Sequence, residues 1–553
     1  MDKAALGWIG DQWRGHKRWM VLLIVGNGVI ALTALAFALG CRWVIDSAVA
    51  GNQGRFYGAG GCLLGIITLY LCLRLGCNIL DEVLRARLGV VLRQRLLHCF
   101  YLKTYPSLST FHSGELLNRL FSDVTVVVDG SVGILPTLVN LSLRILGAIG
   151  LLLWMKQWVL LIFLFGGMGA ISALTFLRRR FKALHQHAQQ AEGEMRSFFQ
   201  EALENRLMVK CFGVEATMEG EAADVQRLFL KKHLKRRGLS VASSSAMDVL
   251  FNYSYCFALL IGGAGMLWTP GGMSYGTLMA MLQLVGQIQN PFAGLSGLLP
   301  RQFAMVASAE RLMALYALPD EEKKTHLDKP VDFDTIALEK VCFGYDPETP
   351  VLRAIDLTIR MGERIALQGA SGGGKTTLFL LLMGIYAPDN GRIWIECGDH
   401  FRTGGPWTRQ LFAWVPQGHF LMSGTLRENL RLLNEEATDD QLWEFLDIAC
   451  AGDFVRQLPQ GLDTGVGERG VGLSEGQIQR IAIARAVASP APILLLDEST
   501  SALDVDTEAA VLHNLEALHR TCIIVTHRPS ALRICNRYFV LKQGRLVENG
   551  LGE

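Results

Sequence analysis

Long apolar runs separated by polar connections dominate the first half of the chain. They are near the roughly 20 residues that a helix needs to cross about 30 Å of hydrocarbon. Because backbone polar groups in lipid must be satisfied within the segment, each run is predicted to be a membrane-spanning helix. The six predicted spans cover about residues 19–44, 56–80, 131–154, 158–177, 246–268 and 276–299.

Basic residues mark alternate ends of these spans. They precede the first and fifth spans and follow the second, fourth and sixth, as Arg18, Arg85, Arg180 and Lys235 illustrate. The other connections are short and poor in basic residues, such as the one that contains Lys156. Since basic connections stay in the cytosol, this pattern predicts that both termini are cytosolic.

Two of the cytosolic connections are long, about 50 and 70 residues, and keep a helical pattern. We expect their helices to continue out of the membrane and to bend back through turns near residues 107–115 and 205–215. Separate soluble insertions are the alternative, which the scarcity of loop-like composition disfavours.

The pattern changes after the sixth span. The polar, proline-bounded segment PDEEKKTHLDKP predicts a linker, and short β-rich runs then alternate with helices. We therefore expect a helical membrane domain over residues 1–316, a linker over 317–335 and an α/β domain over 336–553.

The predicted α/β domain contains a phosphate-binding loop. Residues Gly369–Thr376 are GASGGGKT, between the apolar strand RIALQ and the helix TLFLLLMGI. The glycines let backbone N–H groups turn toward phosphates, and the helix N-terminus favours an anion. Lys375 is predicted to contact the β- and γ-phosphates, and the Thr376 hydroxyl to bind Mg²⁺. The domain is therefore predicted to bind ATP.

Two acids end a second apolar strand, PILLLDE. In α/β folds this end of a strand is where ligands bind. Asp497 is the expected partner of Mg²⁺ through water, and Glu498 is the candidate that polarises the attacking water. A pair of solvated strand-end acids is the alternative, which the phosphate-binding loop disfavours.

Residues 336–553 also resemble the ATPase domain of ABC transporters. LSEGQ, Leu473–Gln477, resembles the family signature, and SALD, Ser501–Asp504, resembles its D-loop. TGVGERG, residues 464–470, resembles the loop that exporters place before the signature. VPQ, IIVTH and FGY supply residues that match the Q-loop glutamine, the switch histidine and the adenine-stacking aromatic: Gln417, His527 and Tyr345.

The first half resembles the membrane domain of bacterial type IV ABC exporters. FHSGELLNRLFSDV and RLMVKCFGVEA resemble the inner loops that form coupling helices on the ATPase domains. The resemblance implies a half-transporter with an all-α six-helix transmembrane domain followed by an α/β P-loop ABC ATPase domain. It also implies the cytoplasmic (inner) membrane as the location, with lipids around the spans and the ATPase domain in the cytosol.

A set of functional residues follows from the resemblance. The catalytic residues would be Glu498, His527, Gln417 and Lys375. The residues at the Mg²⁺ would be Thr376, Gln417 and Asp497. The nucleotide-binding residues would be Tyr345, Gly369, Ala370, Ser371, Gly372, Gly373, Gly374, Lys375, Thr376, Thr377, Ser474, Gly476 and Gln477.

The resemblance further implies a dimer, because each ATP lies between one P-loop and the signature of the other subunit. Ser474, Gly476 and Gln477 would contact the γ-phosphate held by that subunit. Glu475 departs from the family, which usually has Gly there. A carboxylate facing phosphates would repel them, so we expect Glu475 to point away, toward a basic residue. A homodimer is favoured, and pairing with a different half-transporter is the alternative.

Two other departures concern the ends of the sequence. The chain stops soon after GRLVENG, without the family's usual final helix, and no peptidase domain precedes the first span. The first apolar run is too long for a cleavable signal peptide.

Composition agrees with a membrane protein and gives no support for a nucleic-acid partner. Half of the residues are hydrophobic and 19% are charged, below the roughly 25% usual in soluble proteins. The net charge of +2 and the pI near 8.0 lack the basic excess of nucleic-acid binders. The 12 cysteines include no CxxC pair and are expected to be free thiols or small buried apolar residues.

Polar residues inside the spans bear on the cargo. Arg144, Arg74, Arg42 and Asp46 lie in the first three spans, and intramembrane charges usually face a partner or a cavity. Gln283, Gln287 and Asn290 share one face of the sixth span. That face is expected to line the pathway, with helix–helix hydrogen bonding as the alternative. An amphipathic or acidic cargo follows, with a peptide slightly favoured over a lipid or a drug.

The most consistent function is ATP-driven export by a dimer. A soluble ABC ATPase is excluded by the spans, and an importer is disfavoured by the fusion of membrane and ATPase regions. An ATP-gated regulator or channel on the same fold remains an alternative, as does the catalytic half of a heterodimeric exporter. The presence of both Glu498 and His527 favours a working ATPase.

Overall fold

The computed structural model describes residues 3–155, 183–184, 187–268, 273–322, 333–346, 348–398, 400–418, 421–467 and 472–549. The chain divides into two compact units. The first comprises Met1–Cys99 with Ser113–Ala317, and the second comprises Phe100–His112 with Leu318–Glu553.

The first unit is helical. Its elements are α1 (Lys3–Gln12), α2 (Lys17–Val49), most of α3 (Gln53–Leu102), α5 (Ser113–Asn118), the π-helix η1 (Arg119–Asp123), α6 (Val124–Trp154), α8 (Arg206–Phe212), α9 (Glu215–Trp268) and α10 (Tyr275–Tyr316). Every predicted span but the fourth lies within α2, α3, α6, α9 or α10. The fourth, residues 158–177, lies outside the described residues. Within the described residues, Lys17–Val49, Gln53–Leu102 and Ser113–Trp154 are long and apolar enough to cross a membrane.

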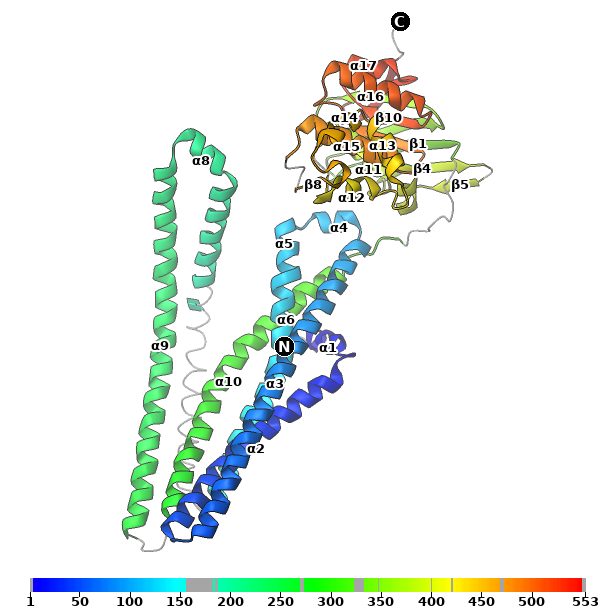
Figure 1. Ribbon diagram of the computed structural model, residues 1–553. Helices are drawn as coiled ribbons and strands as arrows, with labels where there is room; N and C mark the ends of the chain where they lie inside the picture. The colour runs from blue at the N-terminus through cyan, green and yellow to red at the C-terminus, as the bar shows by residue number, and fades with distance from the viewer. Residues whose placement is uncertain are drawn as a thin grey trace. The chain divides into compact units, whose positions relative to one another are not determined.

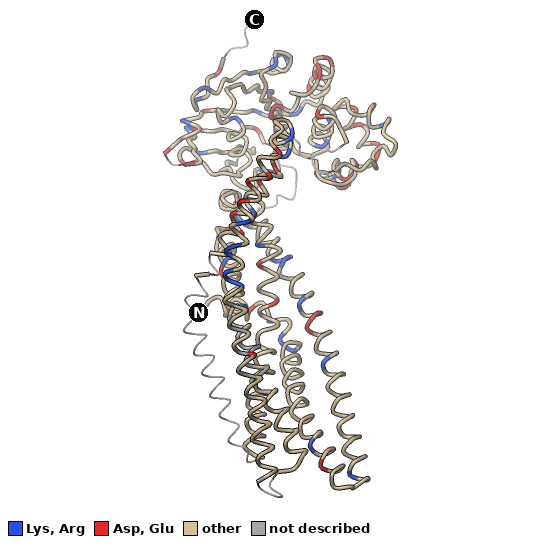
Figure 2. Tube along the Cα trace, turned by 90° about the vertical axis from the view of Figure 1, so that its left-hand side faces the viewer, with Lys and Arg blue, Asp and Glu red and all other residues tan. Residues whose placement is uncertain are grey.

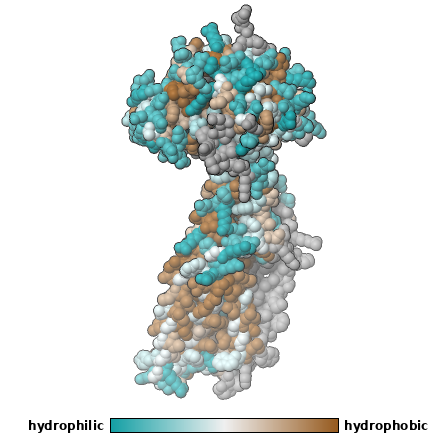
Figure 3. All heavy atoms as spheres, turned by 90° about the vertical axis from the view of Figure 1, so that its right-hand side faces the viewer, coloured by the Kyte–Doolittle hydropathy of each residue, from teal (hydrophilic) through white to brown (hydrophobic). Residues whose placement is uncertain are grey.

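Helices α2, α3, α6 and α10 run side by side (Figure 1), and residues of α2, α6, α9 and α10 share an apolar core that includes Leu35, Ala148 and Met281. Small residues allow close approach: a Cβ on Gly147 would lie 2.1 Å from Leu35 Cδ1. Uncharged residues fill long stretches of these helices (Figure 2), and hydrophobic side chains form a broad band over the face seen in Figure 3. These are the surfaces that a lipid environment requires.

The predicted cytosolic turns are both present. In the first, α4 (Tyr105–Ser109) and α5 separate α3 from α6. In the second, α8 lies between the helix at residues 187–204 and α9, and ends at Gly213 with φ +63°. This left-handed conformation is the usual way for glycine to end a helix.

The second unit contains α4 and an α/β fold with two main sheets. An antiparallel sheet has the order β2-β1-β4-β5: β2 (Leu352–Arg360), β1 (Thr335–Phe343), β4 (Asn390–Cys397) and β5 (His400–Thr403). A larger sheet has the order β12-β11-β3-β10-β9-β6: β12 (Arg545–Asn549), β11 (Arg537–Lys542), β3 (Arg364–Gly369), β10 (Thr521–Val525), β9 (Ile493–Asp497) and β6 (Phe412–Val415). Only the β11–β12 pairing is antiparallel in this sheet.

Helices and short elements complete the unit. They are α11 (Lys375–Leu382), the 3₁₀-helices η3 (Pro406–Leu411) and η4 (Gly461–Asp463), α12 (Leu426–Arg431), α13 (Asp439–Ile448), α14 (Gly452–Gln457), α15 (Glu475–Ala488), α16 (Val505–Ala517), α17 (Pro529–Arg533) and the pair β7 (Gly424–Thr425) and β8 (Gly465–Val466). One core packs residues of the two sheets together with α11, and includes Phe379 and Ile355. A second packs α12, α13, α15 and α16 on the larger sheet, and includes Leu446 and Ile483.

Candidate functional site

The predicted catalytic motifs follow the carboxyl ends of neighbouring parallel strands. β3 ends at Gly369, where the phosphate-binding loop begins, and β9 ends at Asp497. β10 pairs with both strands and is followed by His527, while β6 pairs with β9 and is followed by Gln417. The sheet therefore brings residues from four distant segments to one edge, where α/β folds bind ligands.

The phosphate-binding loop requires its glycines. Gly372 and Gly374 have φ values of +74° and +100°, a region that side chains with a Cβ rarely adopt. Lys375 is buried, and its Nζ donates to the carbonyls of Gly369 (2.6 Å) and Ala370 (3.0 Å). These contacts hold the Lys375 ammonium group beside the loop that is predicted to bind the phosphates.

Two of the three residues expected at Mg²⁺, Thr376 and Asp497, are in contact. Thr376 Oγ1 donates to Asp497 Oδ2 at 2.7 Å. Burial raises the pKa of Asp497, the Glu498 carboxylate adds to this, and Thr376 and Lys375 oppose it. Among the described residues no group of three His, Cys, Asp or Glu side chains could hold a metal. A hydroxyl and a carboxylate beside a phosphate site suit Mg²⁺, which keeps several waters and takes substrate phosphates as ligands.

Glu498 is placed by an unusual backbone conformation. Its φ is +47°, and its N–H donates to the carbonyl of Val525 on β10. The Gln417 amide Nε2 donates to Glu498 Oε2 at 2.7 Å. The Q-loop glutamine and the candidate water-polarising carboxylate are thus joined directly. A non-glycine residue held at positive φ often marks a functional site.

Tyr345 lies just after β1, with one side supported and the other open. Its ring packs against Phe343 and Tyr386, and its hydroxyl shares a 3.0 Å hydrogen bond with Thr377 Oγ1. The residue is 57% exposed, which leaves ring surface for a planar base. Stacking on adenine stays a prediction.

The signature opens α15. Ser474 and Gln477 form a capping box, in which each side chain satisfies the backbone N–H of the other. A Cβ on Gly476 would lie 3.0 Å from the carbonyl oxygen of Ala502, so glycine lets the D-loop approach. Both hydrogen bonds lie within the start of this helix, and the contact of these residues with a nucleotide held by a second chain stays a prediction.

Glu475 is the first residue of α15, and its predicted orientation away from phosphates stays a prediction. It lines a pocket of about 400 Å³ together with Ser474, Gly476 and Asp504. Among the described residues it forms no salt bridge. The nearby Arg480 donates instead to the Cys450 and Gly476 carbonyls and lies over the Phe454 ring. Arg480 is therefore engaged by other groups, and no basic partner of Glu475 is found among the described residues.

Three residues that position these loops were not predicted. Gln479 donates to Ser501 Oγ and accepts from Ala502 N–H. Arg528 donates to the Ser501 and Leu503 carbonyls and to Glu508, which is buried. They tie the D-loop to the signature helix and to the segment after His527. The sequence gives only one hint of this role: Gln479 lies just after the signature LSEGQ, and Arg528 directly follows His527.

Comparison with known proteins decides the family. The ABC transporter family model matches residues 352–501, and the family model of the ABC transporter transmembrane region matches residues 19–292. A relative from Chromobacterium violaceum, an "ATP-dependent lipid A-core flippase", is 30% identical over 97% of this chain and 92% of its own length. The chain belongs to the ABC transporters.

Further similarities agree with this assignment. A second "ATP-dependent lipid A-core flippase", from Thiobacillus denitrificans, is 34% identical over 79% of this chain and 76% of its own length. The structure is also similar to a bacterial Atm1-family ABC exporter with ATP bound, with a TM-score of 0.73, 25% identity and coverage of 96% and 94% of the two chains. The predicted fold class and the predicted ATPase of an ABC exporter are confirmed.

The membrane part of this ABC transporter contains a polar cavity of about 420 Å³ that is open on one side. It is lined from α2, α3 and α6 by Asn27, Tyr70, Arg74, Asn78, Asp81, Arg85, Thr137, Asn140, Arg144 and apolar neighbours. Arg74 Nη1 donates to the Tyr70 hydroxyl at 2.9 Å, and Arg85 pairs with Asp81 and Asp129. Arg144 Nε is buried, without a hydrogen-bond partner in the described part of the chain.

The other predicted intramembrane residues have different surroundings. Arg42 pairs with Asp46 at 3.5 Å, and Asp46 also accepts from the Gly276 N–H at the start of α10. Gln283 Nε2 donates to Cys41 Sγ on α2 at 3.4 Å, a helix–helix contact. The side chain of Asn290 lies outside the described residues. The pathway along this face of α10 stays a prediction.

Proposed function

We propose that the chain forms a dimer that hydrolyses ATP to move an amphipathic lipid with anionic groups across the membrane. The cavity that contains Arg74 and Arg144 carries this proposal. The relatives named above are lipid A-core flippases, which also favours a lipid over the peptide that the sequence slightly favoured.

The cavity has the chemistry of an anion site with apolar walls. Guanidinium groups match phosphate oxygens with directed hydrogen bonds. Arg144 offers a buried Nε donor that meets no protein acceptor among the described residues, and Arg74 meets a tyrosine hydroxyl, which is not a counter-ion. Leu23 and Ile30 supply apolar surface at the same cavity. Since unpaired charges within a membrane are costly, such residues usually serve function.

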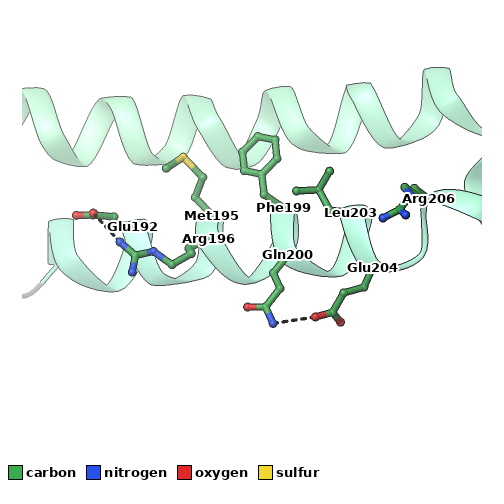
Figure 4. Close-up of a pocket in the computed structure, with 8 residues that line it drawn as sticks. All are labelled: Glu192, Met195, Arg196, Phe199, Gln200, Leu203, Glu204 and Arg206. Atoms are coloured by element: carbon green, nitrogen blue, oxygen red, sulfur yellow. Dashed lines mark hydrogen bonds and ion pairs between the residues drawn. The ribbon is translucent and has the colours of Figure 1, made fainter. Parts of the chain in front are cut away.

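Dimerisation is supported by the second cytosolic turn. Its tip exposes the large apolar side chains of Leu207 (74%) and Phe212 (68%). Next to it lies a pocket of about 570 Å³ lined by residues of the helix at residues 187–204 and by Arg206. Met195, Phe199 and Leu203 of that helix point toward the neighbouring α9 (Figure 4). The Glu192–Arg196 and Gln200–Glu204 contacts lie along the same helix. Exposed apolar surface with polar residues beside it is typical of a protein-contact site.

In the proposed reaction, Lys375 and the loop N–H groups would bind the ATP phosphates, and Tyr345 the adenine. Thr376, Asp497 and Gln417 would hold Mg²⁺, which neutralises phosphate charge when bound. Glu498 would polarise the attacking water and His527 would orient the γ-phosphate. The partner's signature residues would complete each site. Both termini and the ATPase domain would lie in the cytosol.

The test is ATPase activity of the purified chain in vesicles, with and without a diphosphorylated glycolipid, its dephosphorylated form or a cationic peptide. We expect stimulation by the phosphorylated lipid only. Losing a charge-assisted contact costs about 1.5–3 kcal/mol, so Arg144→Gln should raise the half-stimulating lipid concentration by about 10-fold or more.

The matched control is Arg87→Gln, which changes an exposed arginine of α3 that does not line the cavity. It should respond like the unmodified chain. Equal stimulation by the dephosphorylated lipid, stimulation by the peptide alone, or equal effects of Arg144→Gln and Arg87→Gln would contradict the proposal.

A further inference from the structure

Three tyrosines from separate segments of the second unit form a row. The ring of Tyr105, on α4, lies edge-on to Tyr386, with centroids 6.0 Å apart. Tyr386 lies edge-on to Tyr345, with centroids 5.4 Å apart. Phe343 of β1 packs against both Tyr345 and Tyr386. The row therefore runs from the first cytosolic turn to the candidate adenine site.

These rings are not an ordinary core. Tyr105 and Tyr345 are 53% and 57% exposed, and Tyr386 is half-buried. The burial of apolar surface alone does not explain a row of three tyrosine rings at the surface of this unit. Edge-to-face geometry between aromatic rings is favourable and directional, so the position of each ring depends on its neighbour.

The row is anchored to the helix that follows the phosphate-binding loop. The Tyr386 N–H donates to the carbonyl of Leu380 near the end of α11, after Gly384 turns the chain with φ +62°. At the other end of α11, Thr377 shares a hydrogen bond with the Tyr345 hydroxyl. Tyr386 also hydrogen-bonds Ser109 of α4. A nucleotide that reorders α11 or Tyr345 would thereby move the contacts of the turn.

The turn does not need the row in order to stay attached. Lys103 Nζ donates to the Leu318 carbonyl and to Asp320, both at 2.6 Å. Backbone hydrogen bonds join Thr104 to Pro319 and Glu321 to Leu102. Glu321 in turn accepts two hydrogen bonds from Arg409 of η3. Because these contacts already hold the turn, the tyrosines are available for a different role.

We infer that Tyr386 and Tyr105 are positioning residues that transmit the presence of the adenine base, through Tyr345, to the turn at residues 100–112. This inference rests on the proposed binding of adenine by Tyr345. A base that stacks on the open side of Tyr345 restrains its ring, and the restraint passes by edge contact to Tyr386 and Tyr105. Since α3 runs directly into this turn, base binding would bias the membrane helices in addition to the effect of the phosphates.

The test measures backbone hydrogen exchange of residues 100–112 in the full-length chain in lipid nanodiscs. Three states are compared: without nucleotide, with Mg-ATP, and with Mg-ribose 5-triphosphate, which lacks the base. Competition with labelled ATP establishes that the second ligand occupies the site. We expect ATP to slow exchange in the turn more than the base-free triphosphate does. Tyr386→Leu and Tyr105→Leu should each lose this additional protection and keep the part due to the phosphates.

Tyr101→Leu is the matched control, because Tyr101 is an exposed tyrosine near the end of α3, shortly before Tyr105 in the sequence, and makes none of these ring contacts. It should keep the full response to ATP. Equal protection by the two ligands in the unmodified chain would overturn the inference. So would retention of the additional protection by both Tyr386→Leu and Tyr105→Leu, or its loss in Tyr101→Leu.

The readout needs no cargo, so failure of the lipid proposal leaves it unaffected. If ATP binds but Tyr345→Leu binds it as tightly as the unmodified chain, the adenine assignment itself fails. Tyr386→Phe adds a second distinction. It keeps the ring and removes the hydroxyl that meets Ser109, and it should retain the base response if the ring contacts carry it.

Discussion

At the scale of single residues, the ATPase site is held together by contacts among its own members. Lys375 donates to loop carbonyls, Thr376 to Asp497, and Gln417 to Glu498. Each is a group that ATP, Mg²⁺ or water is proposed to engage. Binding therefore exchanges protein contacts for ligand contacts, which keeps these polar groups satisfied in both states.

Glu498→Gln is expected to bind ATP and to hydrolyse it about 10²- to 10⁴-fold more slowly, since an amide cannot accept a proton from water. Gln at this position keeps the size of the side chain and an oxygen for the Gln417 contact. Phosphate release and nucleotide retention, measured on the same preparation, check this. Glu444→Gln, on the exposed side of α13, is the control. Near-normal turnover by Glu498→Gln would show that another group polarises the water.

At the scale of elements, the π-helix η1, which follows α5, is joined to α10 by side-chain hydrogen bonds. Asp123, at the end of the π-helix η1, is buried and accepts from Ser308 and twice from Arg311. Arg119 adds a hydrogen bond to the Arg311 carbonyl and one to Glu115. Glu215, at the start of α9, pairs with the nearby Lys210.

Asp123→Ala is expected to lower the Tm of the purified transporter, with a loss of roughly 2–3 kcal/mol. This is below the usual 3–5 kcal/mol for breaking a buried ion pair because Arg311 is half exposed. Asp224→Ala removes an exposed pair with Arg227 on α9 and should change the Tm little. Equal Tm values for the two variants would mean that the Asp123 network does not stabilise the fold.

At the scale of the whole molecule, one chain supplies one P-loop and one signature, so activity is expected to require a second chain. The signature residues Ser474, Gly476 and Gln477 are all present. They are proposed to contact the nucleotide of a partner chain, and their presence favours a dimer of two identical chains. Glu475 lines the same pocket and carries the wrong charge for it. Unit charges 4 Å apart repel by about 4 kcal/mol at an effective dielectric of 20, and exposure to water would reduce this.

The chain expressed alone is therefore expected to purify as a dimer that hydrolyses ATP, and Glu475→Gly should hydrolyse it several-fold faster. Glu475→Gln separates charge from size, because it removes only the charge. Mass determination in detergent and phosphate release are the measurements. An inactive monomer, rescued only by a different half-transporter, would instead assign the altered signature to a heterodimer.

Sequence alone predicted the features that arise from neighbours along the chain. The spans, the two turns and the motif order follow from hydrophobic length, helical period and residue spacing. Lys375, Thr376, Asp497 and Glu498 could be assigned because strand, loop and helix lie next to one another in the sequence. The physical reason is that local backbone geometry and burial period are encoded within a few residues.

Only the tertiary structure decided which distant residues meet. Asp123 and Arg311 are 188 positions apart, and Tyr105 lies far in sequence from Tyr386 and Tyr345. Nothing in their neighbourhoods distinguishes them from other acids, arginines or tyrosines. The surroundings of Glu475 likewise depend on distant residues, since the nearby Arg480 contacts Cys450, in the turn before α14, and Phe454 of α14. Long-range pairing depends on how the elements pack, and a residue's type and local period do not contain that information.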